Sequence, residues 1–121
     1  MCSRIFPLDA SILLVYHKTM VNDKVVQTAV KTLLQAVSGS KVILFGSHAR
    51  GDARPDSDVD LLVVEPDLQD RFKETVRLNK LLGDMLIPAD VLVVSNEAFE
   101  QWRDVPNTVV YRAVREGRVY E

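Results

Sequence analysis

Cysteine is nearly absent from this chain: Cys2 is the only one among 121 residues, which excludes an intramolecular disulfide and a cysteine-based zinc site. Long apolar runs are missing as well, because the run at residues 12–16 is far too short to cross a bilayer and has no signal-peptide cleavage context. Neither sign of charge dominates, since fifteen basic and seventeen acidic residues give a net charge of −2 and no broad basic face for long DNA or RNA. We therefore expect a cytoplasmic protein that binds neither a membrane nor long nucleic acid.

The length corresponds to a single domain, which we place at residues 21–121. Its first helix is indicated by apolar side chains that recur every four residues, at Val21, Val25, Ala29, Leu33 and Val37. Residues 1–20 form an N-terminal extension in this interpretation. Because the helical pattern begins directly after Met20, Met20 is an alternative start of the native chain.

The segment with the clearest chemistry is a glycine turn followed by paired acids. An apolar strand at residues 41–45 leads into Gly46 and Ser47, and a second strand at residues 59–64 begins with Asp58 and Asp60. Because side chains alternate along a strand, the two acids point the same way with Cα atoms roughly 7 Å apart. Their repulsion calls for a compensating cation, and carboxylate oxygens suit Mg²⁺ or Mn²⁺. The glycine lets backbone approach a ligand, and the turn offers N–H groups to a phosphate.

A third carboxylate, Asp90, begins another apolar strand that continues to Val94. Three convergent carboxylates fit a two-metal site, in which ions roughly 3.5–4 Å apart stabilise the attacking and leaving oxygens of a phosphoryl displacement. The acids meet only if the second and third strands run parallel, joined by the helix between them, and the first strand runs the opposite way. The expected fold class is α/β of the α+β type, with a mixed three-stranded sheet packed with helices.

Further helices are expected after the second and third strands, at residues 68–82, 97–103 and from Asn107 or Thr108 to Glu116. Apolar residues in the first and last of these are expected to face the core: Phe72, Val76, Leu78, Leu81 or Leu82, Val109, Val110, Ala113 and Val114.

The motif resembles the minimal nucleotidyltransferases of the DNA polymerase β superfamily, including the antitoxin-type proteins encoded beside HEPN-domain partners. The resemblance covers roughly residues 20–121 and lies in Gly46, Ser47, Arg50, Gly51, Asp58, Asp60 and Asp90 at their spacing. It implies nucleotide binding by Gly46, Ser47, Arg50 and Gly51, with Asp58, Asp60 and Asp90 as catalytic residues and metal ligands. It also implies Mg²⁺ (or Mn²⁺) as cofactor, ATP as substrate and a tyrosine hydroxyl of a small helical HEPN protein as the acceptor of AMP. Asp90 fits either a metal ligand or a general base.

Five of the seven site residues also have an ordinary structural explanation. Asp58 could be a turn residue, Asp60 an edge-strand charge that blocks aggregation, and Asp90 a common strand-start acid. Ser47 could cap a helix, and Arg50 could be a solvated surface arginine.

Other functions are compatible with the same motif. The acceptor could be a small molecule such as an aminoglycoside, bound in a cleft at the interface of a homodimer, and a homo-oligomer is possible. The chain could also be a non-catalytic antitoxin that neutralises its partner by contact alone. Trp102, Tyr111 and Tyr120 are candidates for a docking surface, although core packing explains these aromatic residues as well.

Overall fold

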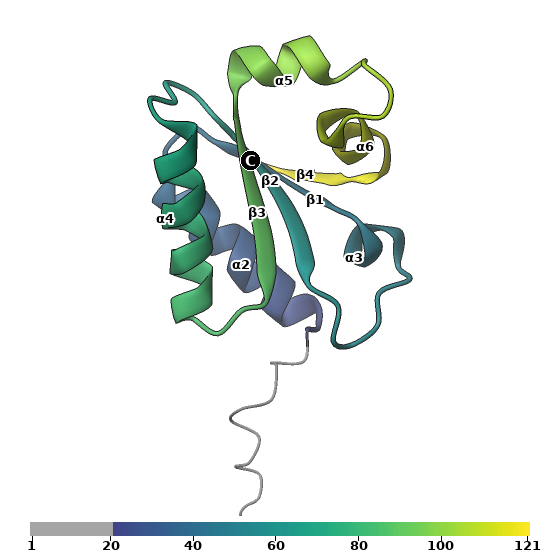
Figure 1. Cartoon of the computed structure of the whole chain (residues 1–121). Coiled ribbons are helices and arrows are strands. Elements are labelled where there is room, and N and C mark those ends of the chain that lie inside the picture. Colours follow the sequence, from purple (N-terminus) through teal and green to yellow (C-terminus); the bar gives the residue numbers. More distant parts are fainter. Residues whose placement is uncertain (1–20) are drawn as a thin grey trace, which may run out of the picture.

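The computed structural model describes residues 21–121, so the N-terminal extension and the alternative start at Met20 lie outside the described residues. The described chain forms a four-stranded mixed sheet with helices on both faces (Figure 1). Its strands are β1 (Lys41–Phe45), β2 (Val59–Glu65), β3 (Ala89–Ser95) and β4 (Arg118–Tyr120), in the order β3-β2-β1-β4. No helix of this described part is long and apolar enough to span a membrane.

The directions of the first three strands are those that the sequence predicts. β2 and β3 run parallel, with Asp60 opposite Asp90, while β1 runs antiparallel to β2, with Phe45 opposite Asp60. The mixed α+β class with a small sheet is thereby confirmed. The number of strands is not three, however, because β4 pairs antiparallel with β1 at the far edge. A strand of three residues is too short to show a periodic pattern in the sequence.

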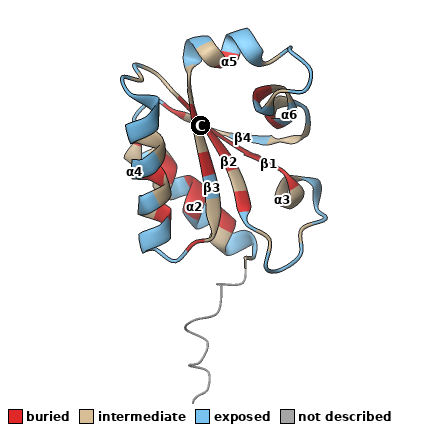
Figure 2. Ribbon diagram, in the orientation of Figure 1, coloured by how far each residue is buried: buried red, intermediate tan, exposed pale blue. Residues whose placement is uncertain are grey.

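The first face of the sheet is covered by α2 (Asp23–Ala36) and α4 (Arg71–Asp84). Each helix begins at a capping side chain: Asn22 accepts a hydrogen bond from the Val25 N–H, and Asp70 accepts one from the Lys73 N–H. Figure 2 shows buried residues on both helices and the strands. The buried core on this face consists of Val26, Ala29, Val30, Leu33, Val37, Val42, Leu44, Val59, Leu61, Val63, Leu78, Leu82, Ile87, Val91 and Val93.

The second face is covered by α5 (Asn96–Trp102) and α6 (Val109–Glu116). The short helix α3 (Ser47–Arg50) directly follows β1, and its Ala49 packs against the core of the first face. Its buried core is smaller and consists of Ile43, Phe45, Leu62, Val64, Phe99, Val110 and Ala113. Because Leu62 and Val64 of β2 point to this face, Asp60, two residues before Leu62, points to it as well. The strands therefore place the predicted acids on the more thinly covered side of the sheet.

Two helices expose apolar residues that the sequence pattern places inward. In α4, Phe72 and Val76 are 77% and 51% exposed, although Leu78 and Leu82 are buried. This helix packs on β3 at the edge of the sheet, so only a narrow stripe of it meets the core. Val109, the first residue of α6, is 39% exposed. The expectation that Phe72, Val76 and Val109 are core residues is therefore wrong.

Candidate active site

Gly46 joins β1 to α3 in a backbone conformation that favours glycine. Its φ is 75° and its ψ is −157°, a region that residues with a side chain rarely occupy. A Cβ atom at this position would overlap the carboxylate of Asp60. The lack of a side chain therefore allows the turn to lie directly against one of the predicted acids.

The rest of the turn is a compact unit between β1 and β2. Ser47 is the first residue of α3, and the N-cap position belongs to Gly46, so the alternative of Ser47 as a helix cap is wrong. Gly51 ends α3 in the left-handed region with φ 85°, and its N–H donates to the Ser47 carbonyl. His48 Nε2 lies 2.9 Å from the carbonyl oxygen of Ser57, which connects the turn to the segment before Asp58.

Asp58, Asp60 and Asp90 gather at the start of the parallel strand pair. Asp60 and Asp90 are register partners on β2 and β3, so both side chains point to the second face, while Asp58 directly precedes β2. β2 lies between β1 and β3, so Asp60 is not on an edge strand and does not serve to protect an edge. The sheet thus brings together acids from two segments that are far apart in the sequence.

The electrostatics of Asp60 reflect this gathering. The pKa of its carboxyl group is raised, first by partial burial and then by the neighbouring charge of Asp90, with a smaller contribution from Asp58. Arg112 and His48 act in the opposite direction and lower the pKa of Asp60. Asp58 and Asp90 are therefore both close enough to Asp60 for their negative charges to disfavour its ionised form.

A divalent cation fits this donor set only in part. No group of three or more His, Cys, Asp or Glu side chains within residues 21–121 is arranged to hold a metal ion. Mg²⁺ is usually bound by one or two carboxylates together with substrate phosphates and waters, rather than by an all-protein cage. Asp60, with Asp90 beside it and Gly46 leaving room against its carboxylate, matches that kind of site. The oxygen donors suit a cation that arrives with a nucleotide, and the ligation by all three acids stays a prediction.

Arg50 is an exposed surface arginine, as the alternative explanation expects, but it is contacted from two sides. Its Nε atom donates to Asp52 at 3.2 Å, and its Nη1 atom donates to Glu116 at 3.2 Å. The pKa of Arg50 is raised, first through the hydrogen bond to Asp52 and further through Glu116. Its guanidinium group is therefore oriented, although 46% of the side chain is exposed.

Two residues near the site have no counterpart in the sequence prediction. Both lie one turn apart on α6: Arg112 stacks over the Phe45 ring at 5.6 Å and is close enough to Asp60 to lower its pKa, and Glu116 contacts Gly46 and Arg50. Arg112 forms no ion pair with any described residue. Only the i, i+4 spacing of these charges on an amphipathic helix is visible in the sequence, and it does not show which strand they face.

Residues 24–115 match the family model of the nucleotidyltransferase domain. The chain belongs to the nucleotidyltransferase domain family. Curated proteins give no match. Among solved structures, a candidate nucleotidyltransferase from Sulfolobus solfataricus aligns with a TM-score of 0.49 and 20% identity, over 78% of this chain and 82% of that one. A toxin–antitoxin structure with AMP-PNP aligns with a TM-score of 0.46 and 20% identity, over 82% of this chain and 72% of that one. Family membership supports nucleotidyl transfer as the class of activity.

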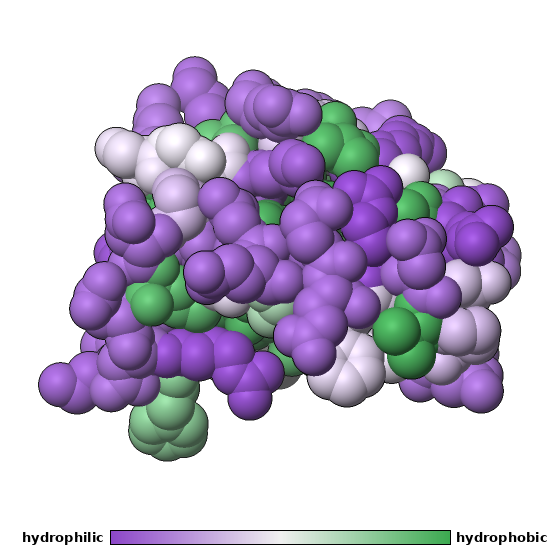
Figure 3. Space-filling model, turned by 90° about the horizontal axis from the view of Figure 1, so that it is seen from above, coloured by the Kyte–Doolittle hydropathy of each residue, from purple (hydrophilic) through white to green (hydrophobic). Residues whose placement is uncertain are grey.

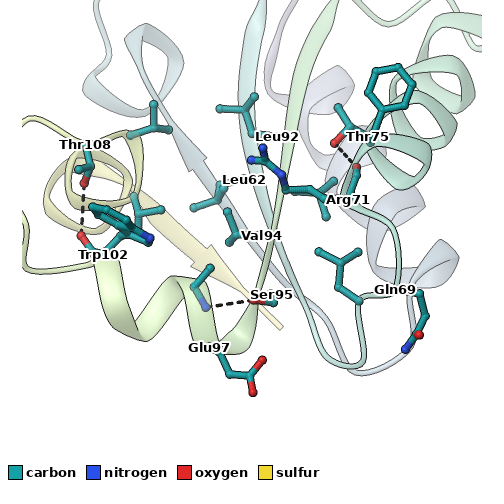
Figure 4. A pocket seen from close by; sticks show the side chains of 16 residues that line it. Leu62, Gln69, Arg71, Thr75, Leu92, Val94, Ser95, Glu97, Trp102 and Thr108 are labelled. Carbon is teal, nitrogen blue, oxygen red and sulfur yellow. Dashed lines mark hydrogen bonds between the residues drawn. The ribbon is translucent and has the colours of Figure 1, made fainter.

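The nucleotidyltransferase domain also carries an apolar groove on the second face, with a volume of about 960 Å³ (Figure 4). None of the predicted site residues lines it. Its floor includes Leu62 and Leu92, which lie two residues after Asp60 and Asp90 on the same strands, so groove and acids share one side of the sheet. Seen from above, the surface is largely hydrophilic, with apolar side chains visible between polar ones (Figure 3).

The three aromatic residues proposed as a docking surface do not lie together. Trp102 lines the groove on the second face and is 42% exposed. Tyr120 packs partly against the core of the first face, and its hydroxyl accepts a hydrogen bond from Gln27. Tyr111 lies under the guanidinium group of Arg115, 4.6 Å from the ring centre. The expectation of one surface formed by these three residues is therefore wrong, because of the three only Trp102 lines the groove of the nucleotidyltransferase domain.

Proposed function

We propose that this chain transfers AMP from ATP to a hydroxyl group of a partner protein, with Mg²⁺ or Mn²⁺ bound alongside the nucleotide. The observation that carries the proposal is the pairing of Asp60 and Asp90 on parallel strands, beside a glycine that leaves room for the Asp60 carboxylate. The family match supports the reaction class.

We place the β- and γ-phosphates of the nucleotide at the turn that contains Gly46, Ser47, Arg50 and Gly51. The forked donors of Arg50 suit phosphate oxygens, and its orientation by two carboxylates favours that role. Arg112 adds a second positive charge near Asp60, without an ion-pair partner among the described residues. We therefore assign Arg112 to the phosphates as well.

Asp58 and Asp60 would hold the divalent cation, with Asp90 as a further ligand or as the general base. When bound, the cation neutralises phosphate charge and lowers the pKa of the acceptor hydroxyl. The acceptor oxygen forms a bond to the α-phosphorus while the bond from that phosphorus to the leaving pyrophosphate breaks. As general base, Asp90 takes the hydroxyl proton.

The acceptor that we propose is a tyrosine hydroxyl of a small helical protein of the HEPN type. The described residues after Asp90 build the rest of β3, α5, α6 and β4, all of which belong to or cover the sheet. Because these elements are needed to complete and cover the sheet, we expect the acceptor to be carried by a second protein. We place the segment with the hydroxyl in the apolar groove, because the groove continues the side of the sheet that bears the acids.

The deciding experiment follows labelled AMP onto protein. The chain is incubated with Mg²⁺, α-labelled ATP and the protein encoded beside it, in parallel with the variant Asp60→Asn, and products are weighed by intact mass. AMP on the neighbour, reduced at least about a thousandfold by Asp60→Asn at unchanged melting temperature, is the expected result. Label on an aminoglycoside without any second protein would instead identify a small-molecule transferase. Binding and inhibition of the neighbour by both forms, without transfer, would identify a non-catalytic antitoxin.

A further inference from the structure

Glu116, the last residue of α6, contacts the proposed nucleotide turn from 70 residues away in the sequence. Its Oε2 atom accepts a hydrogen bond from the Gly46 N–H at 2.7 Å and another from Arg50 Nη1 at 3.2 Å. The Glu116 side chain is only 20% exposed. One carboxylate therefore joins the glycine beside Asp60 to the arginine assigned to the phosphates.

The backbone that carries Glu116 is fixed against the same strand that leads into the turn. A Cβ atom on the next residue, Gly117, would overlap the Ala113 carbonyl and atoms of β1. Directly beyond, Arg118 of β4 pairs with Leu44 of β1, two residues before Gly46. The end of α6 thus has little freedom to move relative to the turn. A carboxylate on such a fixed segment is suited to hold its partners in one geometry.

The contacts of Arg50 leave one side of its guanidinium group for a ligand. Glu116 takes Nη1 and Asp52 takes Nε, whereas Nη2 donates to no residue among 21–121. A planar guanidinium held at two corners presents its remaining N–H groups in a defined direction. Loss of the Glu116 carboxylate would free the Arg50 guanidinium on one side, and it would also leave the Gly46 N–H without its acceptor.

We propose that Glu116 is a positioning residue of the nucleotide site, which holds Gly46 against Asp60 and orients Arg50 toward the phosphates of the nucleotide. The inference rests on the proposed function and adds a residue from outside the motif. Glu116 does not touch the nucleotide and acts through its two partners. The Gly46 N–H is bonded within the protein, so phosphate binding relies on the other donors of the turn and on Arg50.

The test measures the affinity of the full chain for ATP with Mg²⁺ by calorimetric titration, without an acceptor. The variants are Glu116→Ala, Glu116→Gln, Arg50→Ala and the double variant, each with its melting temperature. Glu100→Ala is the matched control, because Glu100 is also paired with an arginine, Arg103 at 3.4 Å, but on α5. We expect Glu116→Ala to raise the Kd about tenfold and Glu116→Gln to raise it less, since the amide still offers an oxygen to Gly46. In the Arg50→Ala background, the same change should raise the Kd by clearly less than tenfold, because only the contact with Gly46 remains to be lost.

The outcomes separate this inference from the proposed function. Equal weakening by Glu116→Ala with and without Arg50 would show a general structural role and overturn the inference. Tighter ATP binding in Glu116→Ala would show that Glu116 competes with phosphate, and it would overturn the inference too. An unchanged Kd in Glu116→Ala would also overturn the inference. In that case the binding of ATP by the wild type would still support the proposed function. If the wild type does not bind ATP with Mg²⁺ at all, the proposed function itself fails, and the inference fails with it.

Discussion

The two faces of the sheet are covered very differently. On the first face, α2 and α4 close a core of fifteen buried residues, all of them apolar. On the second face, α5 and α6 cover a core of only seven buried residues and leave a groove of about 960 Å³ beside the strands. The acids, Arg112 and Glu116 all belong to this second side. The comparison shows that one face supplies most of the burial that stabilises the fold, so the other can remain open and charged.

The strand β2 serves both faces at once. Leu61 and Val63 are fully buried on the first face, while Asp60, between Val59 and Leu61, points to the second. Because side chains alternate with a period of two, a shift of one residue in the pairing of β2 would carry Asp60 into the apolar core. The large first core therefore fixes the register that places the acid.

The strongest test of the second face is Gly46→Ala. The new methyl group would overlap the Asp60 carboxylate, and the backbone there has φ 75°. We expect nucleotide transfer to fall about a hundredfold, as it does when a reacting group is displaced by an ångström, and the melting temperature to drop by several degrees. Steady-state transfer assays and thermal unfolding measure the two effects.

Gly83→Ala is the matched control for this prediction. Gly83 lies inside α4, and a Cβ atom there would meet nothing within 4 Å. Alanine in a helix should stabilise the fold by up to about 1 kcal/mol and leave transfer unchanged. A Gly46→Ala enzyme as active as the Gly83→Ala enzyme would contradict the placement of Asp60 in the site.

A pair of substitutions tests the division of labour between the faces. Leu33 is fully buried in the first core, so Leu33→Ala should lower the free energy of unfolding by about 3 kcal/mol and change the Kd for ATP less than about twofold. Arg112 is an exposed residue near Asp60, so Arg112→Ala should raise that Kd about tenfold at nearly unchanged stability. Denaturant titration and calorimetry supply the measurements. If Leu33→Ala and Arg112→Ala each reduced both stability and ATP affinity to a similar extent, the assignment of stability to the first face and nucleotide binding to the second would be refuted.

The smallest expected effect concerns a carboxyl pair at the opposite end of β2. Glu65 has one side-chain oxygen buried without a hydrogen-bond partner among the described residues, and burial together with Glu74 raises its pKa to about 7. The stabilising contribution of protonated Glu65 is complete below pH 4.5 and is lost as pH rises through 7. Glu65→Gln keeps the side chain neutral, so it should raise the melting temperature by a few degrees at pH 8.5 and hardly at all at pH 5.

Between pH 5 and pH 8.5, Glu74 does not contribute to the pH dependence of stability. The Arg77 guanidinium, 2.8 Å away, lowers the pKa of Glu74 to about 2, so its own contribution is lost only as pH falls from 4.5 toward 2. Glu97→Gln, which makes the same substitution at an exposed position on α5, serves as the control at both pH values. An equal change in melting temperature at both pH values for Glu65→Gln would contradict the burial of a neutral carboxyl group.

Much of this architecture is predictable from local sequence. The apolar runs give β1 and most of β2 and β3, the turn chemistry marks Gly46, and the parallel arrangement follows from the requirement that Asp60 and Asp90 meet. These features depend on residues within a few positions of one another, or on one simple geometric rule.

The errors concern contacts between distant segments. Phe72 and Val76 fit the apolar stripe of a helix, but the sequence does not reveal that α4 lies over an edge strand with one side uncovered. β4 and the contact of Glu116 with Gly46 depend on how the C-terminal segment returns to β1. Nothing in the local pattern around Glu116 distinguishes it from a solvated glutamate at the end of a helix.

The return of α6 and β4 to β1 has a consequence for the order of events during synthesis. Residues 23–95 contain both core helices of the first face and the three long strands, so this part of the structure has all its elements before α6 has been made. The Glu116 contact forms only when α6 and β4 dock, and closing so long a loop is a late step in folding. A nascent chain thus carries its acids well before the Glu116 contact can form, and under the proposed function tight ATP binding would mark a molecule that has finished folding.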